Sequence, residues 1–241
     1  MSANIDVLID KFDNFELIRD EIAAILLVEK ENQKVLADAA GKDPALWDFD
    51  VFRERTSPWE IIEDIDGKIT KETPLVNVYF DQMKNVNSAS NNIDRQQVNG
   101  TFNIDVLAGK NHKTDVDGKI IRGDELAAVE AQRVVRLVRN ILMSNIYTYI
   151  FTATDPASGI PVAFRGENQI VSERTFNQIQ MFQPQINDRP AQHVVGARLQ
   201  MRVDFLEFSP QITGQQMELI SSECTRSSDG LVYFKTDADT T

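Results

Sequence analysis

Two short stretches, DIDGK at 64–68 and DVDGK at 115–119, carry alternating carboxylates before a glycine, as calcium-binding loops do. A helix–loop–helix calcium site needs oxygen ligands at loop positions 1, 3 and 5, glycine at position 6 and glutamate at position 12. When either glycine is placed at position 6, position 1 falls on Ile62 or Lys113, and neither loop ends in glutamate. Asp-Gly between apolar residues is also a strong signal for a tight turn. The sequence therefore predicts two turns and no calcium site.

The chain contains few residues that could act as a catalytic nucleophile or bind zinc. The histidines are His112 and His193, and the single cysteine is Cys224. Two histidines and one cysteine do not make up a zinc ligand set, and no G-x-S-x-G pattern surrounds a serine. The glycine-rich patterns that bind phosphate are absent too. A pairing of His193 with Cys224 or with a serine stays open, but we expect no enzyme, no cofactor and no metal.

A stripe of arginines is the third group of residues that could form a functional site. The segment RVVRLVRN places Arg133, Arg136 and Arg139 at a spacing of three, in a chain whose formal net charge is −12. At about 100° per residue the three side chains lie on one arc of a helix, opposite an apolar face. That face consists of Ala131, Val134, Val135, Val138, Ile141 and Leu142.

Three interpretations of the stripe stay open. The first is a solvent-exposed face whose arginines pair with nearby carboxylates. The second is a contact with a neighbouring subunit, since arginine is favoured at interfaces and acidic patches are plentiful in this chain. The third is DNA binding, which the acidic background and the lack of a second basic cluster disfavour. We therefore take Arg133, Arg136 and Arg139 as interface candidates.

The composition bounds the class of protein. A chain of 241 residues with 42% hydrophobic residues is long enough to form one core without a disulfide or a metal. About half of the acidic residues lie within 1–72, and such a surface disfavours sequence-independent DNA binding. The first residues lack the basic start and apolar run of a signal peptide, and no apolar stretch approaches the ~20 residues of a membrane span. We expect a soluble protein that is not secreted by the classical route.

Hydrophobic periodicity predicts the elements that must position these residues. Apolar spacings of 3 and 4 predict a helix at 14–40, with Asn14 as its N-cap and Gly41 as its stop, and a second helix at 124–146. Alternating or apolar stretches bounded by turn residues predict extended segments. These lie at 75–83, 101–109, 168–182 and 195–210.

Helices and strands do not strictly alternate in this order, which favours an α+β fold. We predict a single domain over 1–210, with a mostly antiparallel sheet packed with the N-terminal helix and the long central helix. Irregular insertions are expected at about 42–73 and 85–100, and a C-terminal extension at 211–241.

The insertion at 85–100 is polar and low in hydrophobic residues. Loops of this length are often functional. We therefore expect it to reach a partner, and we add Asn91, Asn92 and Arg95 to the interface candidates.

Five segments taken together resemble a known family. They are LIRDEIAAILL (17–27), PLVNVYF (74–80), GTFNIDVLAG (100–109), AAVEAQRVVRLVRNILMS (127–144) and ARLQMRVDFLEFSP (197–210). In this order the chain resembles the tail-terminator and head–tail neck proteins of long-tailed bacteriophages. The resemblance lies in the pattern of elements and covers about two thirds of the chain. The two insertions depart from the family's pattern.

The resemblance implies a non-enzymatic structural protein of the virion. Such a protein forms a homo-oligomeric ring, commonly a hexamer, that ends the tail tube and joins it to the head. The implied partners are further copies of itself, tail-tube proteins and head–tail connector proteins, with non-specific passage of DNA and no membrane. The implied location is the tail or neck of the virion, and the host cytoplasm during assembly. Alternatives are another neck or tail-completion protein, a cellular protein-binding module, and an enzyme hidden in the irregular segments.

Overall fold

The first helix of the computed structural model, α1, spans Asn14–Ala39. Its N-cap is Asp13 and not Asn14 as predicted, because Glu16 accepts the Asp13 N–H at 3.0 Å in a capping box. Asn14 instead donates its side-chain amide to the Leu206 carbonyl at 2.5 Å. The residue that we predicted to cap the helix therefore ties its start to the last strand of the sheet.

The structure describes residues 8, 11–64, 66–86, 95–154, 161–163, 169–186, 189–190 and 193–208. Within this part of the chain, Phe12–Phe208 form one compact unit. The predicted extension at 211–241 lies outside the described residues. None of the helices described is both long enough and apolar enough to cross a bilayer.

Both predicted helices form, with small differences at their ends. Helix α1 stops ahead of Gly41, whose φ of +66° is the left-handed conformation that commonly ends helices. Helix α2 spans Gly123–Leu142 and stops before the predicted end at residue 146. The tighter turn η3, Asn145–Tyr147, follows it.

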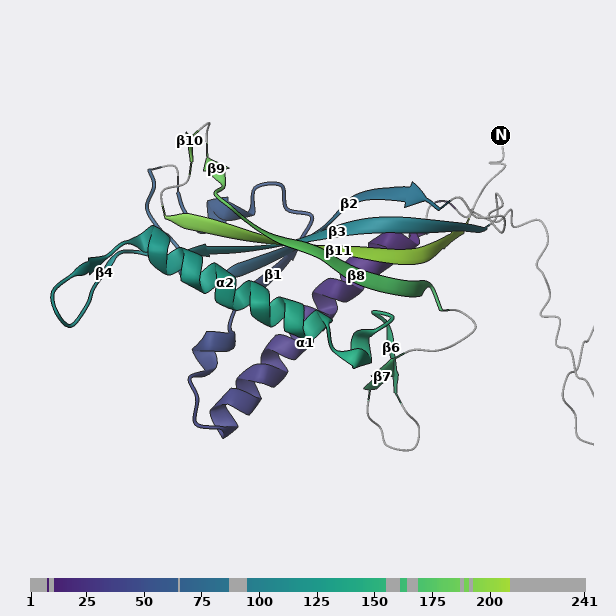
Figure 1. The fold of residues 1–241 in the computed structure, drawn as a ribbon, viewed down its shortest axis with the longest axis horizontal. Helices are drawn as coiled ribbons and strands as arrows, with labels where there is room; N and C mark the ends of the chain where they lie inside the picture. The colour runs from purple at the N-terminus through teal and green to yellow at the C-terminus, as the bar shows by residue number, and fades with distance from the viewer. Residues whose placement is uncertain are drawn as a thin grey trace, which may run out of the picture. The chain divides into compact units, whose positions relative to one another are not determined.

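Five strands form the main sheet in the order β1-β2-β3-β11-β8 (Figure 1). Their bounds are β1 Asp50–Arg53, β2 Leu75–Asn85, β3 Arg95–Gly109, β8 Val171–Phe182 and β11 Val194–Phe208. Strands β1 and β2 are parallel, and every other neighbouring pair is antiparallel. The predicted α+β fold with a mostly antiparallel sheet is confirmed.

Short strand pairs lie outside the main sheet. They are β4 Lys113–Thr114 with β5 Ile120–Ile121, β6 Thr152–Thr154 with β7 Pro161–Ala163, and β9 Gln185–Ile186 with β10 Arg189–Pro190.

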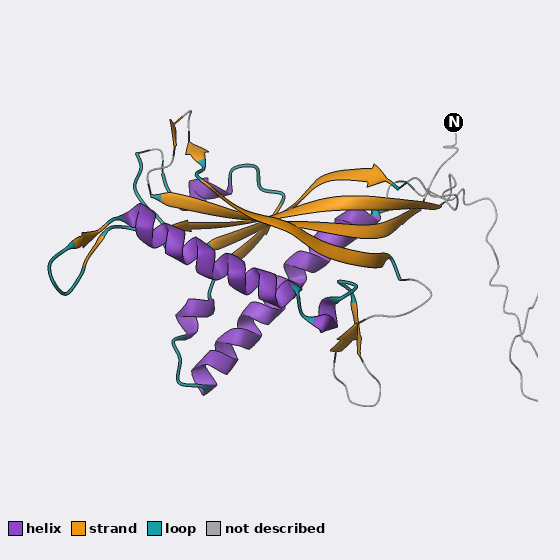
Figure 2. Cartoon of the chain, viewed as in Figure 1, coloured by secondary structure: helices purple, strands orange, loops and turns teal. Residues whose placement is uncertain are grey.

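Helices α1 and α2 cross each other and share one core with one face of the sheet (Figure 2). Alternate residues of the strands point into this core, as the period of two requires. Its members from the two central strands include Phe102, Ile104, Val106, Ala197, Leu199, Met201 and Val203. The apolar face predicted for α2 is buried there in full.

The opposite face of the sheet is covered at one end by a second, smaller core. This core consists of Ile62, Ile69, Leu75, Leu107 and Val194. Its cover comes from the predicted insertion at 42–73, which is more regular than expected. The insertion contains η1 Pro44–Trp47, strand β1 and η2 Pro58–Ile61. Its two tryptophans, Trp47 and Trp59, pack against the first and second core respectively.

The prediction of a loop throughout 85–100 is wrong in its second half. Strand β3 begins at Arg95, which is in register with Phe208 of β11. The sequence did not reveal this part of the strand because its first residues are polar. Pairing with β11 from Arg95, and with β2 from Val98, defines it there. Asn91 and Asn92 lie outside the described residues.

The two Asp-Gly stretches are turns, as predicted, and they share one geometry. In the first, Asp64 Oδ1 accepts the Lys68 N–H at 2.8 Å, and Gly67 has a φ of +82°. In the second, Asp115 Oδ1 accepts the Lys119 N–H at 2.8 Å, and Gly118 has a φ of +80°. Each leading carboxylate is thus occupied by backbone N–H groups of its own turn.

Adjacent leucines on α1 test the placement of the first core. Leu26 is fully buried, whereas Leu27 is 45% exposed. We expect Leu26→Ala to lower the free energy of unfolding by about 2–5 kcal/mol, through lost burial and the cavity left behind. Leu27→Ala should lower it by less than about 1 kcal/mol. Urea denaturation followed by circular dichroism measures both, and equal losses would contradict this orientation of α1.

Candidate functional site

Helix α2 places the three candidate arginines in different surroundings. Arg133 donates two hydrogen bonds to Glu130, at 2.7 and 3.1 Å. The guanidinium of Arg139 lies 6.0 Å from the ring centroid of Phe176 on β8, within cation–π range. Arg136 is exposed and forms no ion pair within the part of the chain that the structure describes. Pairing with a nearby carboxylate thus accounts for Arg133, while the charge of Arg136 is available to a partner.

The pair between Arg133 and Glu130 is local to α2. Burial acts to raise the pKa of Glu130, but the hydrogen bond and the charge of Arg133 outweigh it, so that the pKa is lowered. Glu130 therefore remains ionised and keeps the Arg133 side chain in place. A pair of this kind contributes about 0–1 kcal/mol to stability, so its main effect is to orient Arg133.

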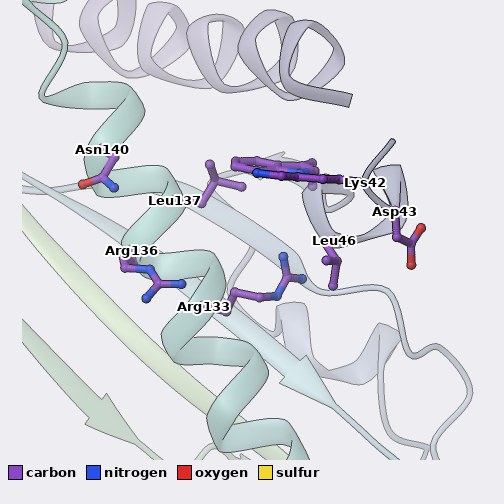
Figure 3. Close-up of a pocket in the computed structure, with 8 residues that line it drawn as sticks. Lys42, Asp43, Leu46, Arg133, Arg136, Leu137 and Asn140 are labelled. Atoms are coloured by element: carbon purple, nitrogen blue, oxygen red, sulfur yellow. The ribbon is translucent and has the colours of Figure 1, made fainter. Parts of the chain in front are cut away.

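Arg133 and Arg136 line a cleft of about 430 Å³ between α2 and the η1 segment. The η1 side contributes Lys42, Asp43, Leu46 and Trp47, and α2 contributes Arg133, Arg136, Leu137 and Asn140. Figure 3 shows Arg133 and Leu137 extending from α2 toward Leu46 across the cleft. Helix α2 and the first insertion are distant in sequence, so this cleft exists only in the folded chain.

The cleft joins an apolar interior to a cationic rim. Leu46 is 49% exposed although it is large and apolar. Lys42, like Arg136, has no ion pair among the described residues. Asp43 accepts the Ala45 N–H at 2.9 Å as the N-cap of η1, so its carboxylate is partly engaged. Such a surface suits an apolar side chain flanked by carboxylates, because charge complementarity at the rim adds to burial at the centre.

A polar network on the face of the sheet opposite α1 and α2 was not predicted from the sequence. Arg198 on β11 donates two hydrogen bonds to Asp105 on β3, at 2.8 and 2.9 Å. The Tyr79 hydroxyl donates to the same carboxylate at 3.2 Å. Arg198 also lies over the rings of Tyr79 and Phe182, at 5.6 and 5.3 Å from their centroids. These contacts compensate the buried charge of Asp105, whose side chain is 7% exposed.

A cavity of about 280 Å³ adjoins this network. The hydrogen bond with Asp105 raises the pKa of Arg198, while burial and the Asp105 charge raise the pKa of Tyr79 to about 12. Both groups therefore keep their protons at neutral pH. Because the network satisfies its own polar groups, it has the character of a structural element and not of an acid–base site.

The remaining predicted residues do not join the cleft. Arg95 is exposed at the first position of β3. His112 is exposed, and Cys224 lies outside the described residues, so its pairing with His193 stays untested. The Nδ1 atom of His193 is buried and has no hydrogen-bond partner among the described residues. Among the described residues, no group of histidine, cysteine, aspartate and glutamate side chains is placed to hold a metal ion.

No protein-family model matches the chain, and no curated protein matches its sequence.

The raised pKa of Tyr79 predicts a pH dependence of stability. Between pH 10.0, the ordinary value for tyrosine, and about 12, the folded protein holds a phenolic proton that the unfolded chain releases. Unfolding then releases a proton, so the free energy of unfolding falls as the pH rises through this range. Tyr79→Phe should make that decline shallower. Urea denaturation at a series of alkaline pH values measures it, and identical declines in both proteins would contradict the prediction.

Proposed function

We propose that this chain is a structural protein of a long-tailed bacteriophage virion, whose copies form a ring that terminates the tail tube and joins it to the head–neck complex. Three features support the proposal: the resemblance of the element pattern, the open edges of the sheet and the acidic net charge of the chain. The open edges carry most of the argument.

The strand β8 forms one edge of the main sheet. It has 12 residues, and among the described residues no strand pairs with its side facing away from β11. Two large apolar side chains on it are exposed, Ile179 at 46% and Met181 at 39%. A long edge strand with exposed apolar residues is a ready template for pairing with another chain.

The other edge is open over part of its length. Strand β1 pairs only with Leu75–Val78, so β2 continues beyond it as an edge strand. Just past the pairing, the Phe80 N–H donates to the Glu54 carboxylate at 3.0 Å. The described residues offer no strand partner to the rest of β2 on that side.

The directions of the strands suit repeated self-association. Strands β2, β3, β11 and β8 are successively antiparallel, so β2 and β8 run in opposite directions. The β8 edge of one copy placed beside the β2 edge of the next would thus continue the antiparallel order. Because the two edges are different surfaces, the contact is heterologous, and heterologous contacts close into rings when the rotation permits.

The charge of the chain fits passage of DNA without retention. At a net charge of −12, a lumen formed by several copies would neutralise few phosphates and bind DNA weakly. The exposed Arg136 and the segment around Asn91 and Asn92 are proposed to contact a neighbouring copy and a tail or connector protein, respectively.

The cleft favours a second candidate, a cellular protein-binding module that works as a monomer or a dimer and forms no ring. A hollow of about 430 Å³ with an apolar interior is large enough to take side chains of a peptide. The oligomeric state discriminates the two proposals.

Native mass spectrometry with negative-stain electron microscopy tests the ring. We expect a closed oligomer with a central channel that binds one end of a tail tube. A folded monomer that leaves tubes uncapped would sink the proposal.

Two single substitutions test the edge contact. Ile179→Lys places a charge in the proposed contact and should shift the protein toward the monomer. Leu27→Lys on α1 is the matched control, since Leu27 and Ile179 are 45% and 46% exposed. Sedimentation velocity measures both variants, and an equal effect of the two would count against the β8 edge.

For the arginine stripe, Arg136→Glu should also lower the fraction of protein in the oligomer. Arg202 is an exposed arginine on β11, and Arg202→Glu should leave that fraction unchanged. The native mass reports the outcome. An unchanged oligomer in Arg136→Glu would remove α2 from the interface.

A further inference from the structure

The hairpin β4–β5 projects away from the start of α2 (Figure 1). Its turn is preorganised: Asp115 Oδ1 accepts the N–H groups of Asp117 and Lys119, at 3.0 and 2.8 Å. Gly118, with a φ of +80°, completes the turn without strain. The second residue of the turn, Val116, is 101% exposed. The hairpin therefore holds an apolar side chain in solvent, between the carboxylates of Asp115 and Asp117.

One exposed valine is no argument by itself, because isolated apolar residues are common on protein surfaces. The second observation is the cleft between η1 and α2, which has the complementary composition. Its interior offers Leu46, Trp47 and Leu137. Its rim offers Lys42 and Arg136, which have no ion pair among the described residues, beside Asp43, whose carboxylate caps η1. The tip of the hairpin also has an apolar centre, Val116, but the residues on either side of it are anionic. Their charge is opposite to that of Lys42 and Arg136.

The tip and the cleft of one chain cannot meet. Helix α2 begins at Gly123, directly after the hairpin, and Arg136 and Leu137 follow in its second half. At 1.5 Å per residue this separates the cleft from the helix start by about 20 Å. The hairpin points away from the helix body (Figure 1). Any contact between the two surfaces therefore joins two molecules.

We propose that the hairpin tip of one copy inserts Val116 into the α2–η1 cleft of a second copy, with the Asp117 carboxylate facing Lys42 and Arg136. The inference rests on the self-association in the proposed function and names surfaces that would serve it. Each copy carries one tip and one cleft on separate elements, so the contact is heterologous and passes from copy to copy. The preorganised turn reduces the ordering cost of the contact.

A charge-reversal cycle tests the contact. Asp117→Arg and Arg136→Asp should each weaken self-association by about tenfold, because each places like charges together. The double variant Asp117→Arg/Arg136→Asp should regain association to within about threefold of the wild type, because the pair is restored with opposite polarity. Sedimentation velocity over a concentration series measures all three.

The chain supplies a matched control in its other Asp-Gly turn. Asp66 occupies the position there that Asp117 occupies in the hairpin, and its turn has the same hydrogen bonds. Asp66→Arg should leave association unchanged. Loss of association in this variant equal to that in Asp117→Arg would attribute the effect to net charge and overturn the inference.

Cross-linking separates this inference from the proposed function. In a Cys224→Ser background, chains with Val116→Cys are mixed with chains that carry Leu46→Cys and oxidised. A disulfide-linked dimer of the two kinds of chain supports the contact. If the wild type forms rings, but the two cysteine variants do not cross-link and the double variant does not regain association, the inference is overturned and the proposed function stands. A wild-type chain that neither sediments as an oligomer nor cross-links overturns both.

Discussion

Strand β3 is buried on both faces, and the rest of the structure follows from that constraint. Its final ten residues, Gly100–Gly109, are all buried. Antiparallel sheets commonly leave one face to solvent, so a strand covered on both sides requires two separate covers. Helices α1 and α2 supply one. The other comes from the segment between β1 and β2, which folds back over Leu107 with Ile62 and Ile69.

The same constraint explains the polar network. Asp105 and Asn103 face the side opposite α1 and α2, and as whole residues they are 5% and 3% exposed, so each needs a partner. Asp105 finds Arg198 directly across the ladder, because the register pairs these two residues. A shift of β11 by one residue would turn Arg198 toward the apolar core and leave Asp105 without this partner. The ion pair and the two apolar faces therefore specify one register between β3 and β11.

Periodicity predicted both helices and the polarity of their faces, because the apolar residues of α1 and α2 recur at spacings of three and four. It also located β11, in which buried and less buried residues alternate from Ala197 to Phe205. It missed the first residues of β3, where polar side chains leave no pattern. The N-cap was misassigned because Asp13 and Asn14 are both favourable there, and only the bond from Asp13 to Glu16 decides between them.

The cleft could not be predicted for a different reason. Its α2 wall was visible as an arginine stripe, but Leu46 and Trp47 come from a segment about 90 residues earlier, and their approach depends on the packing of Trp47 against the core. The partner of Asp105 was equally hidden, since register between distant strands is a property of the whole sheet.

The start of α1 has a mechanical consequence. The Glu207 carboxylate accepts the backbone N–H groups of Asn14 and Phe15, at 3.1 and 3.0 Å, next to the bond from Asn14 to Leu206. The first helix and the last strand of the compact unit are thus stapled to each other. A force that pulls the two ends of this unit apart would act on these few hydrogen bonds first. The sheet would bear the force only after they broke.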